Sequence, residues 1–318
     1  MGKKVIFVGG TSYSGSTFFH LTLANDPKGF AVGEVKHLFR PTTAWHVSPD
    51  WMCGCEDPDC RLWERVRRNG EAHLYETIFD IHPEVDFIVV SSKNIVWIDG
   101  QTDRLARQGI EARHVAIWKT PAEFAHSLHK RNLLQKKNGA ELANWPRYYS
   151  TFYSFVPAFR TVKYASYMHQ QSQVLESACE RLDIPYFAGK EAFWQKRHHV
   201  LGGNPSARIH LLEKKSDQYE GVMDSIRNLG QPGIAADTHR QLYYENPDEQ
   251  VVQIHVDKLR RETPHFDMFE EMLTAHDVVR AGPPDREWPE LRLGPIEMRL
   301  RRLRQLRRDG MGKLKYSR

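Results

Sequence analysis

The strongest constraint on the fold is a glycine-rich loop near the N-terminus, at residues 10–17. Its sequence, Gly-Thr-Ser-Tyr-Ser-Gly-Ser-Thr, follows an apolar, β-branched run at residues 4–8 and leads into a segment at 15–25 that we expect to be helical. A glycine loop between a strand and a helix can turn several backbone N–H groups toward one point, where the helix N-terminus adds about half a positive charge. The loop therefore predicts a binding site for a polyanion such as a nucleotide.

The rest of the chain alternates between strand and helix patterns. We expect further strands at residues 30–34, 86–91, 113–118 and 184–187. Helices are expected at residues 120–137, 145–182 and 216–229. Strands separated by helices predict a parallel sheet with crossover connections. Together with the loop, this predicts an α/β fold of the P-loop NTPase-like type, with a central parallel sheet of about five strands flanked by helices in three layers.

The loop differs at one position from the hydrolase spacing G-x-x-x-x-G-K-[ST], because Ser16 stands in place of the lysine. The strand at 86–91 leads into Ser91-Ser92-Lys93, without the aspartate that usually holds magnesium. A sulfonate carries one fewer negative charge than a phosphoryl group, so fixed hydrogen-bond donors and lysines can suffice for its transfer without a metal. Two alternatives remain open here: a P-loop kinase or NTPase, and a catalytically silent nucleotide-binding protein.

Residues 14–17, Ser-Gly-Ser-Thr, resemble the donor loop of the PAPS-dependent sulfotransferase family, bacterial type. The resemblance implies that Tyr13, Ser14, Gly15, Ser16 and Thr17 bind the co-substrate PAPS (3′-phosphoadenosine 5′-phosphosulfate). It also implies transfer of the sulfonate to a hydroxyl of a carbohydrate, a small alcohol or phenol, or a tyrosine, with release of adenosine 3′,5′-bisphosphate. Tyr13 occupies the place of a family Lys or Arg, so either another lysine replaces it or the activity is lost.

Three more residues match the family's donor-binding positions. Lys119, at the end of a predicted strand, and Ser127, eight residues later in the next helix, correspond to the pair that holds the 3′-phosphate. Lysine offers a point charge, whereas the arginine of the family can form bidentate hydrogen bonds to a phosphate. The segment 199–208 resembles a late basic loop that folds over the donor, and Arg208 is its candidate phosphate ligand.

The reacting groups are expected where parallel strands end, since ligands collect at the carboxyl edge of such sheets. The resemblance assigns Glu34 as the base that takes the acceptor proton, with His37 as its rival. A carboxylate shielded from water can have its pKa raised toward the working range. Lys93 is expected to neutralise charge on the sulfonate and the departing phosphate, which would compensate for Tyr13, and Lys36 is the reserve candidate.

The four cysteines are too few for a disulfide scaffold in 318 residues. Cys53, Cys55 and Cys60 are potential metal ligands, but they lack the paired spacing of structural zinc sites. An obvious fourth ligand is also missing, although His46 would complete a set of four. We favour a cysteine-rich loop near the acceptor pocket and expect no metal.

Charge is distributed unevenly along the chain. Residues 299–318 hold nine Lys or Arg and one Asp, a local net charge of +8. Because the whole chain has a net charge of +5, the other residues together have a net charge of about −3. We expect a sulfotransferase domain at 1–290 that binds no nucleic acid, and a basic helical tail at 291–318. The leucines of this tail recur every third residue, so it either docks on the body, is solvated, or contacts a membrane surface or an acidic partner.

No segment is long and apolar enough to span a membrane, and we expect a cytoplasmic protein whose oligomeric state the sequence leaves open.

Overall fold

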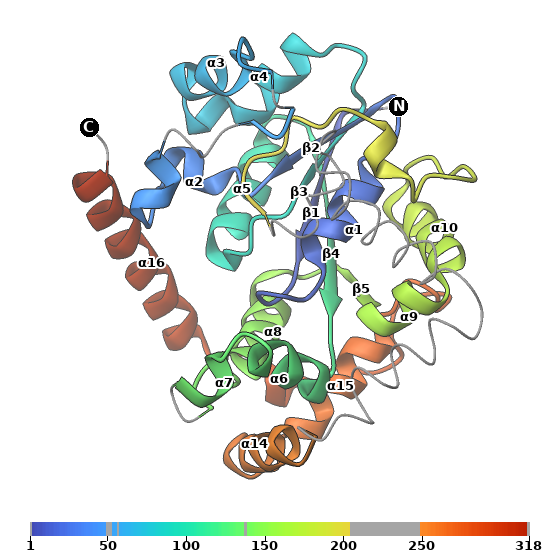
Figure 1. Cartoon of the computed structure of the whole chain (residues 1–318), viewed down its shortest axis with the longest axis vertical. Helices are drawn as coiled ribbons and strands as arrows, with labels where there is room; N and C mark the ends of the chain where they lie inside the picture. The colour runs from blue at the N-terminus through green and yellow to red at the C-terminus, as the bar shows by residue number, and fades with distance from the viewer. Residues whose placement is uncertain (1, 49–52, 56, 137–138, 204–248, 317–318) are drawn as a thin grey trace.

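The structure is a computed structural model that describes residues 2–48, 53–55, 57–136, 139–203 and 249–316 (Figure 1). The predicted helix at 216–229 and the predicted donor ligand Arg208 lie outside the described residues. Within the described residues, no helix combines the length and the apolar character needed to cross a membrane.

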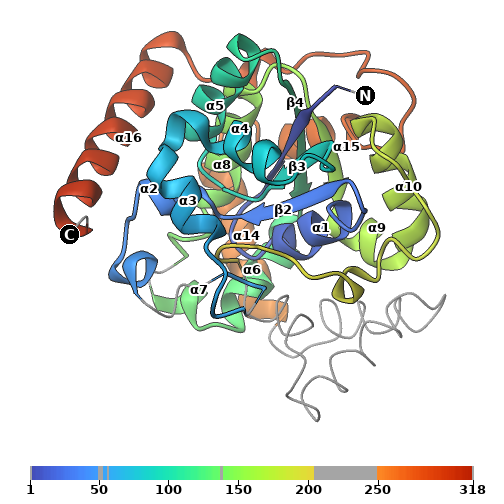
Figure 2. The same ribbon diagram turned by 90° about the horizontal axis from the view of Figure 1, so that it is seen from above.

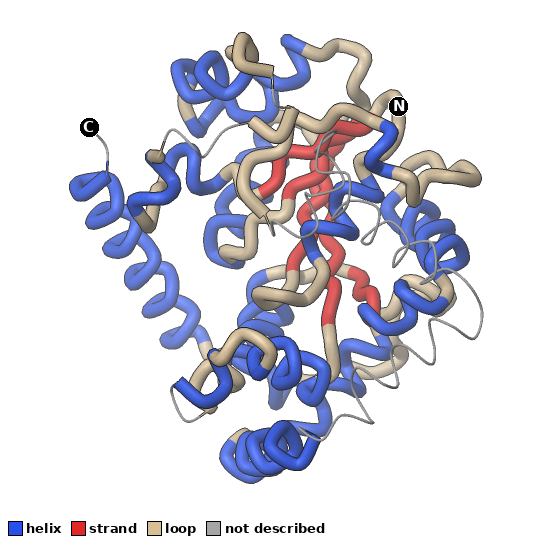
Figure 3. The backbone as a smooth tube through the Cα atoms, viewed as in Figure 1, coloured by secondary structure: helices blue, strands red, loops and turns tan. Residues whose placement is uncertain are grey.

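A β-sheet forms the centre of the molecule (Figure 3). It has five strands, and all of its strand pairs are parallel. Its spatial order is β2-β3-β1-β4-β5. The strands are β1 (Lys4–Gly9), β2 (Gly29–Gly33), β3 (Phe87–Val90), β4 (Glu111–Trp118) and β5 (Arg160–Lys163). This arrangement confirms the predicted α/β fold with a central parallel sheet of five strands flanked by helices.

Helices cover both faces of the sheet, so the protein has three layers (Figure 2). Apolar side chains of the central strands pack against the helices on each face. Ile6 and Val8 of β1 pack under α1 (Ser16–Leu23), α9 (Tyr164–His169) and α10 (Gln171–Leu182). The opposite face is covered by α2 (Lys36–Phe39), α3 (Leu62–Asn69), α4 (Leu74–Ile81), α5 (Ile95–Arg107), α6 (Pro121–His129), α8 (Asn144–Phe155), α14 (Glu249–Glu262) and α15 (Phe266–Ala275). Successive strand residues point to opposite faces, so a run that is apolar throughout requires cover on both.

The remaining elements of the described residues are short, apart from one long C-terminal helix. They are α7 (Leu133–Lys136), α16 (Pro295–Tyr316) and the 3-10 helices Ala44–Val47, Glu71–His73, Phe193–Gln195 and Pro289–Leu291.

Two predictions about the second half of the sheet are wrong. Residues 184–187 do not form a strand, and β5 comes instead from residues 160–163, inside a region expected to be helical throughout. Pro157 cannot continue α8, and the β-branched pair Thr161 and Val162 is fully buried beside β4, where Val162 lies opposite Ile117. Tertiary pairing therefore overrides the local helical pattern here.

The helix that starts at Thr120 is shorter than predicted. The expected capping box is present, because Glu123 N donates to Thr120 Oγ1 and Thr120 N donates to the Glu123 carboxylate. The helix ends at His129, and Asn132 then adopts a positive φ of 54°, so residues 133–136 form a separate turn, α7.

The basic C-terminal segment is helical as predicted, and α16 packs along the body beside α5 (Figures 1 and 2). Asp309, which is only 3% exposed, accepts hydrogen bonds from Lys36 Nζ at 3.0 Å and from Arg40 at 2.8 Å. Gln305 accepts from Asn94 at 2.7 Å. The helix thus docks through buried polar groups, while its Leu303 and Leu306 stay exposed, so the idea of a fully solvated tail is wrong.

We predict that Asp309→Asn lowers the free energy of unfolding by about 3 kcal/mol, because it leaves buried cations without their counter-charge. Burial alone would raise the pKa of Asp309, but Arg40 and Lys36 outweigh it and lower that pKa in the folded state. The difference between wild type and variant should therefore shrink as the pH falls through this lowered pKa. Denaturant unfolding at several pH values measures it, with the exposed Asp285→Asn as control. A difference independent of pH would contradict the ion-pair account.

Candidate functional site

The glycine loop lies where β1 passes into α1, and two of its glycines are required by geometry. Gly10 has φ of 149°, and a Cβ there would lie 2.6 Å from the carbonyl oxygen of Ile117. Gly15 has φ of 93°, and a Cβ there would lie 2.5 Å from the ring of Tyr164. Larger side chains at these positions would displace the loop from the end of the sheet.

The start of α1 has the features of an anion seat. Gly15 is the N-cap, and α1 has neither a side-chain cap nor an acidic residue in its first turn. Ser14 Oγ is buried and has no hydrogen-bond partner among the described residues. A helix N-terminus without its own cap, beside an unpartnered hydroxyl, suits a phosphate group. Ser14, Ser16 and Thr17, which the sequence predicted for donor binding, all lie at this point.

Lys119 and Ser127 come together as their spacing predicted. Lys119, at the end of β4, donates from Nζ to Ser127 Oγ on α6 at 3.0 Å, and it is 6% exposed. Its Nζ also lies 4.3 Å from the centre of the Tyr164 ring. Burial lowers the pKa of Lys119 to about 8, although Glu123 acts in the opposite direction. A desolvated ammonium at the edge of the glycine loop favours an anionic ligand.

Arg131 contributes a further cation that the sequence analysis did not place in the site. Its guanidinium lies 4.2 Å from the centre of the Tyr13 ring, and one of its N–H groups donates to Ser127 O at 2.8 Å. Tyr13 itself has a positive φ of 65°. Arg131 therefore brings charge to the position where the loop lacks its basic residue. Its spacing of four residues from Ser127 was the signal available in the sequence.

Glu34 and Lys93 form an ion pair at the carboxyl ends of β2 and β3. Lys93 Nζ lies 2.7 Å from Glu34 Oε1, and both side chains are about a quarter exposed, at 27% and 23%. Burial by itself would raise the pKa of Glu34, but the charge and hydrogen bond of Lys93 outweigh it, so the pKa is lowered. The expectation of a raised pKa for Glu34 is therefore wrong for the protein without a ligand.

His37, the rival base, stacks on His46 with ring centres 3.8 Å apart. Burial, followed by the charges of His46 and Lys36, lowers the pKa of His37 to about 4. Its imidazole is therefore neutral near pH 7. Lys36, the reserve candidate, is bound to Asp309 as described above and is not paired with the glutamate.

His20 is a buried neighbour of the Glu34 and Lys93 ion pair, and the sequence analysis missed it. It lies on α1 three residues after Thr17, and its Nδ1 is 3.0 Å from Thr17 O. Its Nε2 is buried without a hydrogen-bond partner in the described part of the chain. Burial lowers the pKa of His20 to about 4, and the charges of Glu34 and Lys93 both reach it. The only sequence signal was its position one helical turn beyond the loop.

A cavity of about 800 Å³ adjoins the loop on the side of Lys93 and α16. It opens between the start of α5, the helices α6 and α8, and the docked C-terminal helix. Its charged lining consists of Lys93, Glu141, Arg147, Glu297, Arg301, Arg304 and Arg308. A space of this size, next to the predicted reacting groups, can hold a small acceptor molecule.

Comparison with known proteins gives a match at the level of structure. No family model matches the sequence, and no curated protein matches it either. Three of the solved structures that resemble it are two sulfotransferase domains and a sulfotransferase. Two are the sulfotransferase domain from the curacin biosynthetic pathway and that of the Synechococcus PCC 7002 olefin synthase, both with a TM-score of 0.46.

The curacin domain is 14% identical to this chain, and the match covers 78% of this chain and 99% of the domain. The olefin synthase domain is 15% identical, and the match covers 78% of this chain and 98% of the domain. The third, a sulfotransferase from Alicyclobacillus acidocaldarius, has a TM-score of 0.38 and 12% identity, and covers 74% and 99%. At these values the likeness adds no argument about the reaction, which has to come from the residues of the site.

Proposed function

We propose that the chain transfers a sulfonate group from PAPS to a hydroxyl group of an acceptor and releases adenosine 3′,5′-bisphosphate. The observation that carries this proposal is the buried contact of 3.0 Å between Lys119 and Ser127, beside an uncapped helix N-terminus. A nucleotide with phosphates at two separate positions fits two separate anion seats. One lies at α1 and the other at the Lys119 and Ser127 pair.

The 5′-phosphate of the donor would bind at residues 14–17, where Ser14 Oγ lacks a partner within the described chain. The 3′-phosphate would accept hydrogen bonds from Lys119 and Ser127, and its charge would return the pKa of Lys119 toward its ordinary value. Arg131, next to both Tyr13 and Ser127, would supply the charge that Tyr13 cannot. No step of this binding requires a metal ion.

The ion pair between Lys93 and Glu34 supports a coupled role for the two residues. In the free protein Lys93 holds Glu34 ionised and lowers its pKa. A bound donor would attract Lys93 toward its sulfonate and bridging oxygen. Burial would then raise the pKa of Glu34, so that it becomes a base of useful strength only when the donor is in place.

The chemical step follows from this arrangement. Glu34 removes the proton from the acceptor hydroxyl, and the oxygen attacks sulfur in line with the bond to the 5′-phosphate. That sulfur–oxygen bond breaks, and its electron pair leaves with the phosphate of adenosine 3′,5′-bisphosphate. Lys93 and the N-terminus of α1 stabilise the negative charge on this leaving group.

The acceptor would occupy the cavity of about 800 Å³ beside Lys93. Four arginines and two glutamates contribute to its lining, and Glu297 pairs with Arg301 at 2.9 Å and with Arg304 at 3.5 Å. The excess of guanidinium groups favours an acceptor that carries an anionic group besides its hydroxyl. Carbohydrates, small alcohols or phenols, and tyrosine all remain within this description.

We predict that Lys119→Met weakens the binding of adenosine 3′,5′-bisphosphate by about 10- to 100-fold, the equivalent of one charge-assisted hydrogen bond. In the wild type, only the protonated Lys119 binds the phosphate, so the affinity should fall as the pH rises above about 8. Calorimetric titration between pH 7 and about 9.5 measures both effects. The exposed Lys28→Met, whose side chain pairs with Asp86 at 2.8 Å, is the control and should retain affinity and pH dependence. An unchanged affinity in Lys119→Met would remove the 3′-phosphate assignment.

We predict that Glu34→Gln keeps its affinity for adenosine 3′,5′-bisphosphate and lowers kcat by about 10²- to 10⁴-fold, because the amide cannot accept the acceptor's proton. Transfer of radioactive sulfonate from labelled PAPS to a panel of hydroxyl acceptors, with EDTA present, measures turnover. The exposed Glu64→Gln should behave as the wild type. If Glu34→Gln stays active and His37→Asn is inactive, the base is His37. A wild type that binds the bisphosphate but labels no acceptor would support the catalytically silent alternative.

A further inference from the structure

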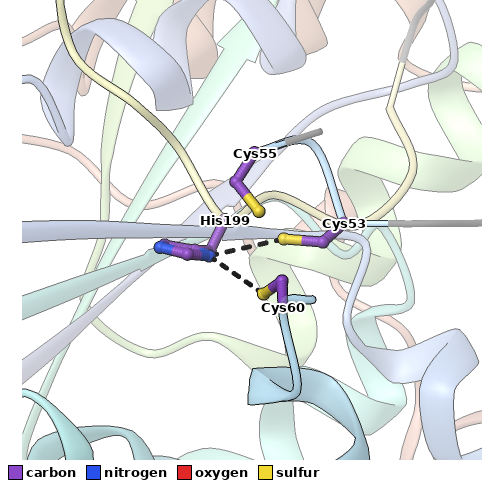
Figure 4. A group of neighbouring side chains, drawn as sticks. All are labelled: Cys53, Cys55, Cys60 and His199. Atoms are coloured by element: carbon purple, nitrogen blue, oxygen red, sulfur yellow. Dashed lines mark hydrogen bonds between the residues drawn. The ribbon is translucent and has the colours of Figure 1, made fainter. Parts of the chain in front are cut away.

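A second cluster of reactive side chains lies outside the donor site, where the cysteine loop meets the segment before Gly203. Cys53, Cys55, Cys60 and His199 converge there, and their ligand atoms all lie within 4.8 Å of one another (Figure 4). His199 follows Cys60 by 139 residues, so the group is assembled only by the fold. The sequence analysis therefore lacked the fourth member, while His46, its suggested substitute, stacks on His37 elsewhere.

The distances in this cluster match those around a tetrahedral ion. His199 Nδ1 lies 3.4 Å from Cys53 Sγ and 3.6 Å from Cys60 Sγ. Zn–S bonds of about 2.3 Å and a Zn–N bond of about 2.0 Å at the tetrahedral angle place sulfur and nitrogen roughly 3.5 Å apart. A single ring nitrogen has either one proton or one lone pair, so it cannot form good hydrogen bonds to two sulfurs at once. A cation between them satisfies all of these atoms.

The backbone around the cluster holds the ligands in place. Gly54 N donates to Val200 O at 2.8 Å, and a Cβ on Gly54 would lie 2.5 Å from a methyl group of Val200. Arg197 Nε donates to Cys55 O at 3.0 Å. The ring of His199 stacks parallel to Phe30 with centres 5.7 Å apart. Glycine between the two cysteines thus allows the loop to lie directly against the chain that carries the histidine.

We propose that Cys53, Cys55, Cys60 and His199 bind one Zn²⁺ ion in a closed, structural site. Three thiolates and one imidazole are ligands of zinc rather than of magnesium, calcium or manganese, which prefer oxygen. Four protein ligands fill a tetrahedral shell and leave no open position for catalysis. This proposal replaces the sequence-based expectation of no metal, and it is independent of the proposed transfer reaction.

The zinc site would hold the backbone next to β2, close to Glu34. Two residues after His199, Leu201 pairs with β2, because Leu201 N donates to Val32 O at 3.1 Å and Glu34 N donates to Leu201 O at 2.7 Å. The zinc would connect this added strand segment to the cysteine loop. Its structural role is therefore to hold the backbone that positions Glu34.

The first test is the metal content of the untagged protein, purified without chelators and measured by inductively coupled plasma mass spectrometry. We expect about one zinc per chain, and less than about a tenth of that in Cys60→Ser. Cys179→Ser is the matched control, since Cys179 is a buried cysteine on α10, and it should keep its zinc. Equal zinc in Cys60→Ser and wild type would overturn the proposal.

A second measurement on the wild type avoids any dependence on the folding of variants. Metal-free protein, prepared with a chelator, should bind one Co²⁺ and develop the visible absorption of tetrahedral cobalt with thiolate ligands, and Zn²⁺ should then displace it. A protein that contains no zinc as purified and gives no such spectrum contradicts the proposal, as does a disulfide between two of the three cysteines under non-reducing mass spectrometry. Binding of adenosine 3′,5′-bisphosphate, measured on the same samples, separates this outcome from a failure of the proposed function.

Discussion

The parallel arrangement of the five strands is the constraint on which the site depends. Because neighbouring strands run in the same direction, their carboxyl ends meet at one edge, and the chain leaves each of them there with a polar residue or a glycine. β1 delivers the anion loop, β2 and β3 deliver Glu34 and Lys93, and β4 delivers Lys119. Residues that are distant in the sequence thereby meet at the carboxyl edge of the sheet. The topology of the sheet brings them together, and no direct contact between them is needed for this.

Burial gives these groups their chemical character. Lys119 and Glu34 are both removed from much of the solvent, and in each case the resulting pKa depends on which charge lies opposite. For Lys119, burial lowers the pKa, although the charge of Glu123 acts in the opposite direction. Glu34 has Lys93 as a counter-charge, which outweighs the effect of burial and lowers the pKa of Glu34 as well. Burial thus determines the direction of the pKa shift of Lys119, whereas the ion pair with Lys93 determines that of Glu34.

The sequence predicts the features that local patterns encode, and it misses those that only tertiary contacts create. The loop, β1 to β4 and the capped start of α6 follow from residue spacing, as does the meeting of Lys119 with Ser127. β5 was missed because Thr161 and Val162 become a strand only beside β4. The sequence analysis also missed the contacts of Arg131 with Tyr13, of Asp309 with Lys36 and Arg40, and of His199 with the cysteines, because these contacts join segments that are distant in the sequence.

The central claim is that this protein holds an adenosine with two separate phosphates, and does so without a metal. Calorimetric titration of the wild type in EDTA with adenosine 3′,5′-bisphosphate, ADP and AMP, and with ATP in excess magnesium, tests it most directly. The account predicts that the bisphosphate binds in EDTA at least about tenfold more tightly than ADP or AMP, which lack a 3′-phosphate for Lys119 and Ser127. Tight binding of magnesium ATP together with no detectable binding of the bisphosphate would contradict it.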